Sequence, residues 1–121
     1  MTLVRAERLR KDYRVGDLVV PAVRGVDFTI SSGSFVCFVG PSGSGKTTLL
    51  NMIGCLDRPS WGRLSVLDTQ VGQLDRRQAA AFRGEHIGFV FQDFNLIPVL
   101  TVYENVEYPL IMVQQWSTAA R

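Results

Sequence analysis

The sequence predicts an α/β fold that opens with a small antiparallel β layer. Two continuous apolar runs of strand length, residues 35–39 and 87–91, alternate with stretches of helical periodicity. Runs of this kind are typical of strands buried on both faces of a parallel sheet. A glycine-rich loop links the first run to a helix, and the composition, 46% apolar and 20% charged, is that of a globular chain. The 121 residues therefore fit one α/β domain.

The first third of the chain predicts only β structure. Residues 3–13 alternate loosely between apolar and polar side chains and predict an edge strand. A turn at residues 16–17 leads into extended stretches over residues 19–30, which are broken near residues 24–25. A second turn at residues 31–33 ends this region. These short extended stretches and turns predict the antiparallel layer.

The middle of the chain predicts a strand, a loop and a helix in succession. Residues 35–39 predict a buried strand that runs directly into the loop at residues 40–47. The next segment has one apolar helical face, because its apolar residues recur at i, i+3, i+4 and i+7. These residues are Leu49, Met52, Ile53 and Leu56. Pro59 ends the helical region.

The remaining elements continue the alternation. Residues 63–66 predict a short strand, and residues 75–83, which are Ala-rich and charged, predict a surface helix. Residues 87–91 predict the second buried strand. Residues 101–112 predict a short helix that is broken at Pro109.

The charge of the chain argues against nucleic acid as a partner. A net charge of +2 is too small to indicate nucleic acid or an anionic membrane surface. A basic cluster near the N-terminus is interleaved with apolar residues, so we interpret it as a solvated strand face rather than a polyanion site. The cluster consists of Arg5, Arg8, Arg10 and Lys11.

Cysteine usage and hydropathy set further limits. Cys37 and Cys55 lie in apolar stretches and are interpreted as small buried hydrophobes. No Cys/His cluster predicts a metal site built from protein side chains alone. The first ten residues lack the apolar core of a signal peptide, and no stretch reaches the about 18 apolar residues of a membrane span. We expect a cytosolic chain that reaches a membrane through a partner.

The loop at residues 40–47 carries the pattern G-x-x-x-x-G-K-[ST], which cradles nucleotide phosphates. Gly40 and Gly45 permit backbone angles that turn N–H groups inward, with no side chain blocking a phosphate. The following helix directs free N–H groups and its positive dipole end at the same anion. Lys46 supplies positive charge for the β- and γ-phosphates, and the Thr47 hydroxyl is placed to ligate Mg²⁺.

The predicted cofactors of this loop are ATP and Mg²⁺. The nucleotide-binding residues predicted within it are Gly40, Pro41, Ser42, Gly43, Ser44, Gly45, Lys46, Thr47 and Thr48. The alternative is a Gly/Ser-rich loop with one exposed lysine. A buried strand before the loop and an amphipathic helix after it are the context that the phosphate motif requires, so we favour the phosphate site.

Two segments resemble the ATP-binding subunits of the ABC family, and the resemblance covers essentially the whole chain. Residues 40–50, Gly-Pro-Ser-Gly-Ser-Gly-Lys-Thr-Thr-Leu-Leu, resemble the Walker A segment. Residues 90–98, Val-Phe-Gln-Asp-Phe-Asn-Leu-Ile-Pro, resemble the Q-loop segment, and residues 100–106, Leu-Thr-Val-Tyr-Glu-Asn-Val, are also typical. Two motifs in this order make the resemblance highly specific.

Finer details resemble one branch of that family, which serves lipoprotein-release, macrolide-export and cell-division permeases. They are Tyr13 and the segments at residues 20–26 and 89–96. The resemblance implies a P-loop NTPase core behind the antiparallel β layer. Residues 1–121 would form the N-terminal part of an ABC nucleotide-binding domain, truncated before the signature helix and the Walker B strand.

The resemblance also implies roles for single residues. Tyr13 matches the aromatic residue that stacks on adenine, and an aromatic face suits a flat base. Gln92 matches the Q-loop glutamine, which ligates Mg²⁺ or orients the attacking water and is therefore the catalytic candidate. Mg²⁺ would be held by Thr47 and Gln92. His86 precedes Gln92 and does not match the family's switch histidine, so we expect a surface or boundary position for it.

The function implied is that of an ATP-binding subunit that couples ATP binding and hydrolysis to transport through a membrane permease. Its partners would be an integral-membrane permease and a second copy of the complete domain. It would lie in the cytoplasm, on the inner face of the cell membrane. Several apolar residues near the Q-loop could be core or could contact the permease, and both alternatives stay open. They are Phe94, Leu96, Ile97, Tyr103 and Val106.

The 121 residues do not contain the family's signature, its Walker B aspartate with the adjacent glutamate, or its switch histidine. Without a general base the chain alone is expected to bind nucleotide weakly and to turn it over negligibly. An open sheet edge predicts a tendency to aggregate, as in a truncated record or product of a longer gene. The alternatives are a non-catalytic nucleotide-binding or interaction module and an unrelated P-loop kinase or GTPase. The setting of Gln92 argues against the latter.

Overall fold

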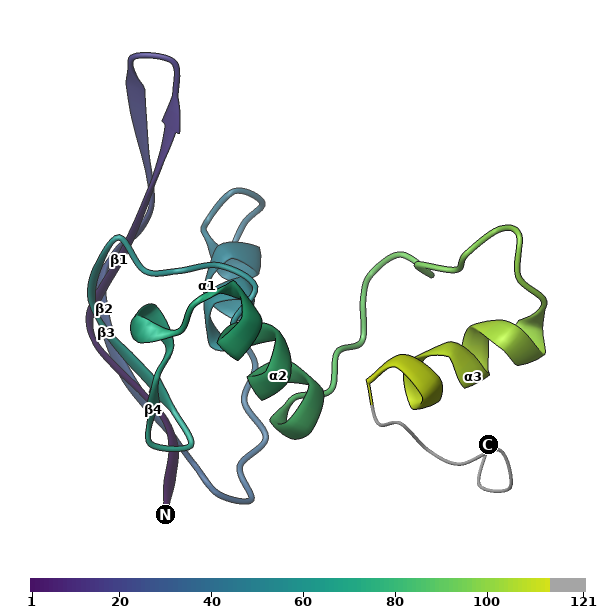
Figure 1. Ribbon diagram of the computed structural model, residues 1–121. Coiled ribbons are helices and arrows are strands. Elements are labelled where there is room, and N and C mark those ends of the chain that lie inside the picture. The colour runs from purple at the N-terminus through teal and green to yellow at the C-terminus, as the bar shows by residue number, and fades with distance from the viewer. Residues whose placement is uncertain (114–121) are drawn as a thin grey trace. The chain divides into compact units, whose positions relative to one another are not determined.

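The computed structural model describes residues 1–113, which divide into two compact units, residues 1–80 and the described residues from 81 onward. Figure 1 shows the order of the elements along the chain. Residues 114–121 of the predicted domain lie outside the described part. Each unit is described by itself below.

The first unit contains a four-stranded antiparallel sheet in the order β2-β1-β3-β4. Its strands are β1 (Thr2–Val15), β2 (Leu18–Ser31), β3 (Trp61–Val66) and β4 (Thr69–Gln70). The hairpin of β1 and β2 extends well past the end of β3 (Figure 1), because β3 pairs with β1 only as far as Arg10. The predicted antiparallel layer is confirmed. The prediction of an edge strand over residues 3–13 was wrong, because β1 lies between β2 and β3.

A bulge interrupts the sheet where Arg8 adopts a left-handed backbone conformation, with φ of 46°. The register of β1 shifts here against both neighbouring strands. Gly62 lies opposite the bulge on β3 with φ of 81°. A Cβ atom on Gly62 would overlap the carbonyl oxygen of Arg8 and lie 2.6 Å from that of Glu7. Only glycine therefore fits this position.

The core of the first unit lies between the sheet and helix α1 (Lys46–Ile53), which contacts β2 and β3. Leu9, Leu64 and Met52 are fully buried, and Leu49 of α1 is buried with them. Val71 in the short 3₁₀ helix η1 (Val71–Gln73) is also buried. The predicted helical face therefore holds for Leu49 and Met52. It does not hold for Leu56, which follows the end of α1 and is 47% exposed.

The two predicted buried strands at residues 35–39 and 87–91 are not assigned as strands in the described part of the chain. Phe35 is 99% exposed and Val90 is fully exposed. A strand of a parallel sheet is held by hydrogen bonds to neighbouring strands, and an extended segment with no such ladder stays open to solvent. The prediction that Cys37 is buried was wrong for the same reason, whereas Cys55 is buried as predicted.

Helix α2 (Arg76–His86) spans the boundary between the units and confirms the predicted surface helix. Its start is capped reciprocally. The Gln78 N–H donates to the Asp75 carboxylate at 2.8 Å, and the Asp75 N–H donates to the Gln78 side chain at 2.9 Å. These two bonds satisfy donors that the first turn leaves unpaired, so Asp75 marks the helix start.

Helix α3 (Val102–Met112) begins with a full capping box formed by Thr101 and Glu104. The prediction that this helix breaks at Pro109 was wrong, because Pro109 lies inside it. A proline removes one N–H donor from the helix. The cap holds the first turn, and the Val113 N–H donates to the Pro109 carbonyl at 3.0 Å at the other end, so the helix continues through the proline.

Candidate functional site

The phosphate loop, residues 40–45, ends at the start of α1 on a glycine that has no substitute. Gly45 is the N-cap residue with φ of 96°, in the left-handed region. Its carbonyl accepts the Leu49 N–H at 2.9 Å and so begins the helix. A Cβ atom on Gly45 would overlap the carbonyl oxygen of Ala22 on β2. Backbone angle and close contact with β2 both require glycine here.

The first turn of α1 presents unpaired backbone donors. No side chain caps the helix and no acidic residue lies in its first turn. Within the described residues, no acceptor is found for the N–H groups of Lys46, Thr47 and Thr48. Free N–H groups and the positive end of the helix dipole together suit an anion.

Lys46 brings its ammonium group back onto the loop that precedes it. The Nζ atom donates to the carbonyl oxygens of Gly40, at 2.5 Å, and Pro41, at 2.8 Å. It also donates to the Ser44 hydroxyl at 3.3 Å. A Cβ atom on Gly40 would lie only 2.8 Å from that same hydroxyl. The loop thus gathers a cation and unpaired N–H groups within a few residues, which is the donor set that a polyphosphate needs.

An open hollow of about 470 Å³ lies beside this loop within the first unit. Gly43, Ser44, Gly45 and Lys46 line it on the loop side, and residues 21–24 and 26 of β2 are among the others. The described residues contain no group of His, Cys, Asp and Glu side chains that could hold a metal ion. Hydroxyl and phosphate oxygens are the ligands that Mg²⁺ prefers, so the exposed Thr47 hydroxyl fits an ion carried in with a phosphate.

Tyr13, predicted as the base-stacking residue, is brought to the first turn of α1 by the long hairpin. Its hydroxyl donates to a carboxylate oxygen of Asp57 at 2.8 Å and lies 3.4 Å from the Thr48 hydroxyl. The residue as a whole is 37% exposed. The structure therefore brings Tyr13 together with the predicted phosphate loop in one unit.

Two residues at this site, Lys11 and Asp57, were missed by sequence reasoning. Lys11 Nζ donates to Asp57 at 2.7 Å and to the Arg58 carbonyl at 2.7 Å, and it lies 5.1 Å from the centroid of the Tyr13 ring. The interpretation of Lys11 as solvated was wrong, because its side chain is only 13% exposed. Its two-residue spacing from Tyr13, which puts both on one strand face, was a usable signal. Nothing local points to Asp57.

The Asp57 carboxylate is held in its charged form. Partial burial by itself would raise its pKa, but the hydrogen bonds from Lys11, from the Tyr13 hydroxyl and from the Arg58 N–H outweigh burial, so the pKa is lowered. Both carboxylate oxygens are used, because Oδ1 accepts from Lys11 and Arg58 while Oδ2 accepts from Tyr13.

A pH dependence follows from this lowered pKa. The unfolded chain takes up the Asp57 proton more readily than the folded chain, so acid favours unfolding. The stability from these contacts is complete above the ordinary aspartate pKa of about 3.9 and is lost as the pH falls through the lowered pKa of the folded state. In urea unfolding, the free energy of unfolding of the wild type should exceed that of Asp57→Asn at pH 7, and this difference should become smaller near pH 3. A difference of constant size would contradict this assignment.

Gln92 lies in the second unit, on an exposed segment without helix or strand. Asn105 holds the end of that segment. Its side-chain oxygen accepts from the Ile97 N–H at 2.8 Å, and its amide nitrogen, with two hydrogens to donate, lies 3.3, 3.2 and 2.9 Å from the carbonyl oxygens of Ile97, Leu100 and Thr101. The apolar residues left open between core and surface are all exposed. They are Phe94, Leu96, Ile97, Tyr103 and Val106.

His86 is a half-exposed residue that contacts Phe82 and Glu85, as expected of a surface or boundary residue.

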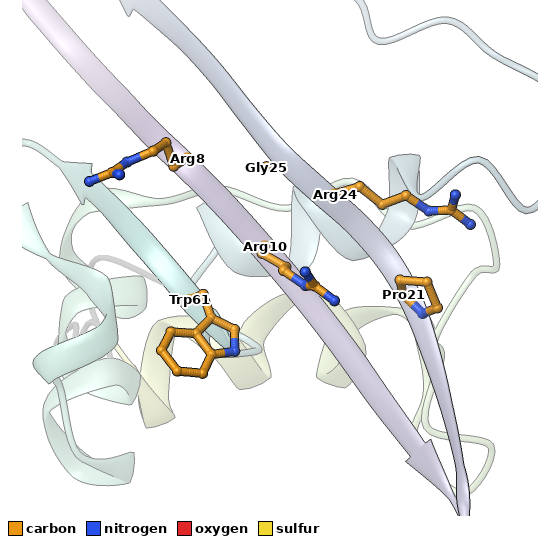
Figure 2. A pocket seen from close by; sticks show the side chains of 6 residues that line it. All are labelled: Arg8, Arg10, Pro21, Arg24, Gly25 and Trp61. Atoms are coloured by element: carbon orange, nitrogen blue, oxygen red, sulfur yellow. The ribbon is translucent and has the colours of Figure 1, made fainter.

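A second hollow, of about 460 Å³, lies on the sheet of the first unit and is basic. It is lined by Arg8, Arg10, Pro21, Arg24, Gly25 and Trp61 (Figure 2). Arg10 is paired with Asp12 at 3.0 Å, and Figure 2 shows the side chains of Arg8 and Arg24 directed away from each other. These side chains therefore do not converge on one point.

The described part of the chain contains no helix long and apolar enough to cross a membrane.

Comparison with known proteins gives one consistent result. The family model described as ABC transporter matches residues 23–121. The chain is 45% identical over 109 residues to the uncharacterized ABC transporter ATP-binding protein MJ0796 of Methanocaldococcus jannaschii, covering 90% of this chain and 46% of that protein. It is 48% identical over 108 residues to the lipoprotein-releasing system ATP-binding protein LolD of Anaeromyxobacter dehalogenans, covering 89% and 45%.

A fused relative and a solved structure agree with this. The macrolide export ATP-binding/permease protein MacB of Syntrophobacter fumaroxidans is 48% identical over 110 residues, covering 91% of this chain and 15% of that protein. A dimeric post-hydrolysis structure of the ATP-binding cassette MJ0796 bound to ADP and Pi superposes with a TM-score of 0.88 at 43% identity. It covers 96% of this chain and 50% of that one. The chain thus spans about half the length, or less, of these relatives.

Proposed function

This chain belongs to the ABC transporter family, and from this premise we propose that residues 1–121 form the ATP-binding part of a transport ATPase subunit. The observation that carries the proposal is the loop at residues 40–45. There, unpaired N–H groups, the Lys46 ammonium and a glycine-only turn lie together at the start of α1. We assign residues 40–48 to the phosphates of ATP and Tyr13 to its adenine.

We propose Thr47 and Gln92 as the protein ligands of Mg²⁺. Bound with the nucleotide, Mg²⁺ supplies charge neutralisation between the phosphate oxygens. The Thr47 hydroxyl is exposed at the first turn of α1, and the Gln92 amide is exposed on its own segment, so both oxygens are free to ligate. Gln92 is also our candidate for orienting the attacking water.

The proposed partners are an integral-membrane permease and a second ATP-binding subunit. The exposed apolar residues between Phe94 and Val106 support a protein contact in this segment. The relatives support the class of partner, since MacB is named an ATP-binding/permease protein and the MJ0796 cassette was solved as a dimer. On this proposal the subunit lies in the cytoplasm, on the inner face of the membrane. It couples ATP binding and hydrolysis to the transport of cargo through the permease.

Calorimetry of the purified chain with Mg-ATP and with Mg-tripolyphosphate, which lacks a base, tests the proposal. We expect both to bind, ATP more tightly, because Tyr13 adds a contact to the base. We expect phosphate release at the rate of the buffer control, since these 121 residues contain no general base of the family. Turnover above the control would overturn that second expectation. Failure of both ligands to bind would overturn the first.

A further inference from the structure

We propose that Asp57 and Lys11 are positioning residues that hold the Tyr13 ring for the base of the nucleotide, leaving one face of the ring open to it. The inference rests on the proposed function, because nucleotide binding at this site is part of that proposal. It goes further by assigning a task to two residues outside the phosphate loop.

The first step is that the Tyr13 side chain is held at its end. A phenol ring on a strand can rotate about two side-chain bonds. A hydrogen bond at the hydroxyl restricts the first, whereas the second, whose axis passes through the hydroxyl oxygen, is restricted by a group packed against the ring face. The hydroxyl donates to Asp57 at 2.8 Å. The carboxylate is itself fixed, because its other oxygen accepts from Lys11 at 2.7 Å and from the Arg58 N–H at 2.8 Å. Charge-assisted bonds of this kind are the stronger ones in proteins.

The second step is that one face of the ring is already taken. The Lys11 ammonium lies over the Tyr13 ring, 5.1 Å from its centroid, within the range of a cation–π contact. Lys11 is in turn tied to Asp57 and to the Arg58 carbonyl. Since Tyr13 remains 37% exposed, we assign the base to the ring face opposite Lys11.

The third step is that the same contacts link the base platform to the phosphate helix. Asp57 follows α1 closely in sequence, and the Tyr13 hydroxyl lies 3.4 Å from the Thr48 hydroxyl in the first turn of α1. A nucleotide needs a set distance between its base and its phosphates. A ring tied to α1 keeps that distance without an ordering cost at the moment of binding, which is the advantage of preorganisation.

A purely structural Asp57 would make a different prediction. If it only joined β1 to the segment after α1, its loss would weaken every ligand of the site alike. A positioning role affects only ligands with a base. Tripolyphosphate, which engages the phosphate loop alone, therefore separates the two roles.

The test is the affinity of Asp57→Asn for Mg-ATP and for Mg-tripolyphosphate, measured by calorimetry. We expect roughly fivefold or greater loss for ATP, the lower end of the range for a lost base stack, and no change for tripolyphosphate. Asp12→Asn is the matched control, because the Asp12 carboxylate is also ion-paired but bonds to Arg10 rather than to the Tyr13 hydroxyl; it should change neither affinity.

Loss of tripolyphosphate binding would reveal misfolding of Asp57→Asn. A second set of variants therefore tests the same role without that substitution. Tyr13→Phe keeps the ring and removes the tethering hydroxyl, and Lys11→Met keeps the length of the side chain without its charge. Each variant should lower the affinity for ATP and leave the affinity for tripolyphosphate unchanged. The double variant Tyr13→Phe/Asp57→Asn should lose no more than Asp57→Asn does, because both break the same contact.

Equal losses for both ligands in all of these variants, or no loss of ATP affinity in any of them, would overturn the positioning role while leaving the phosphate site standing. Absence of tripolyphosphate binding in the wild type would instead overturn the proposed function, and the positioning role would fall with it.

Discussion

Lys46→Ala is expected to weaken the binding of Mg-ATP by roughly 10- to 150-fold, the range that corresponds to the loss of a hydrogen bond to a charged group. In the structure the ammonium group lies on the loop, donating to the carbonyls of Gly40 and Pro41. The substitution removes the cation from that loop while the N–H groups of α1 remain. The residual affinity should therefore be low, and it should depend more on the salt concentration than on whether the ligand carries a base.

Calorimetry of Mg-ATP and Mg-tripolyphosphate checks this result, and both ligands should lose affinity together. Lys46→Arg should not restore binding fully, because a planar guanidinium does not fill the place of a compact ammonium. Arg76→Ala, which removes an exposed positive charge at the start of α2, is the matched control and should leave both affinities unchanged. An unaltered affinity of Lys46→Ala for tripolyphosphate would remove the loop from the phosphate site.

Gly62→Ala is expected to destabilise the first unit by about 3 kcal/mol or more, among the larger effects of a single substitution. Two causes combine. Its φ of 81° is strained for any residue with a Cβ atom. That atom would also overlap the carbonyl oxygen of Arg8, which is backbone and cannot move away without disturbing the pairing of β1 with β3.

Urea unfolding of three alanine variants separates these causes. Gly16 has φ of 61° but open space around it, so Gly16→Ala should show only the backbone strain, about 1 kcal/mol. Gly72 has neither a left-handed backbone nor a close neighbour, the nearest atom being Pro59 Cδ at 3.9 Å, so Gly72→Ala should lie within about 0.5 kcal/mol of the wild type. If Gly62→Ala were no less stable than Gly16→Ala, the overlap with Arg8 would have no energetic effect.

The sequence predicted those parts of the site whose chemistry is local. Residues 40–48 are contiguous, so the loop, the start of the helix and their side chains can all be predicted from one segment of the sequence. The antiparallel layer was equally legible, because turns and alternation are short-range signals. The prediction of a break at Pro109 was wrong because the helix is held at both ends by hydrogen bonds that the proline leaves intact.

The two apolar runs show where local pattern stops being informative. Their composition marks residues 35–39 and 87–91 as strands that would be stable if covered on both faces. It cannot say what covers them, and in the described part of the chain both are largely exposed. Coverage depends on neighbouring elements, which a run of five residues does not specify.

By itself, then, the sequence pointed to the loop that we propose as the phosphate site, with its Lys46, Thr47 and glycine positions, because a phosphate cradle is built from consecutive backbone N–H groups. Only the tertiary structure decided how Tyr13, the residue that we propose for the base, is held. Tyr13 and Asp57 lie 44 residues apart, and Lys11 and Asp57 lie 46 apart. They meet because the register of β1 and the course of α1 bring the hairpin alongside the helix and the segment that follows it. Contacts of that kind follow from the packing of whole elements, which no local pattern of residues records.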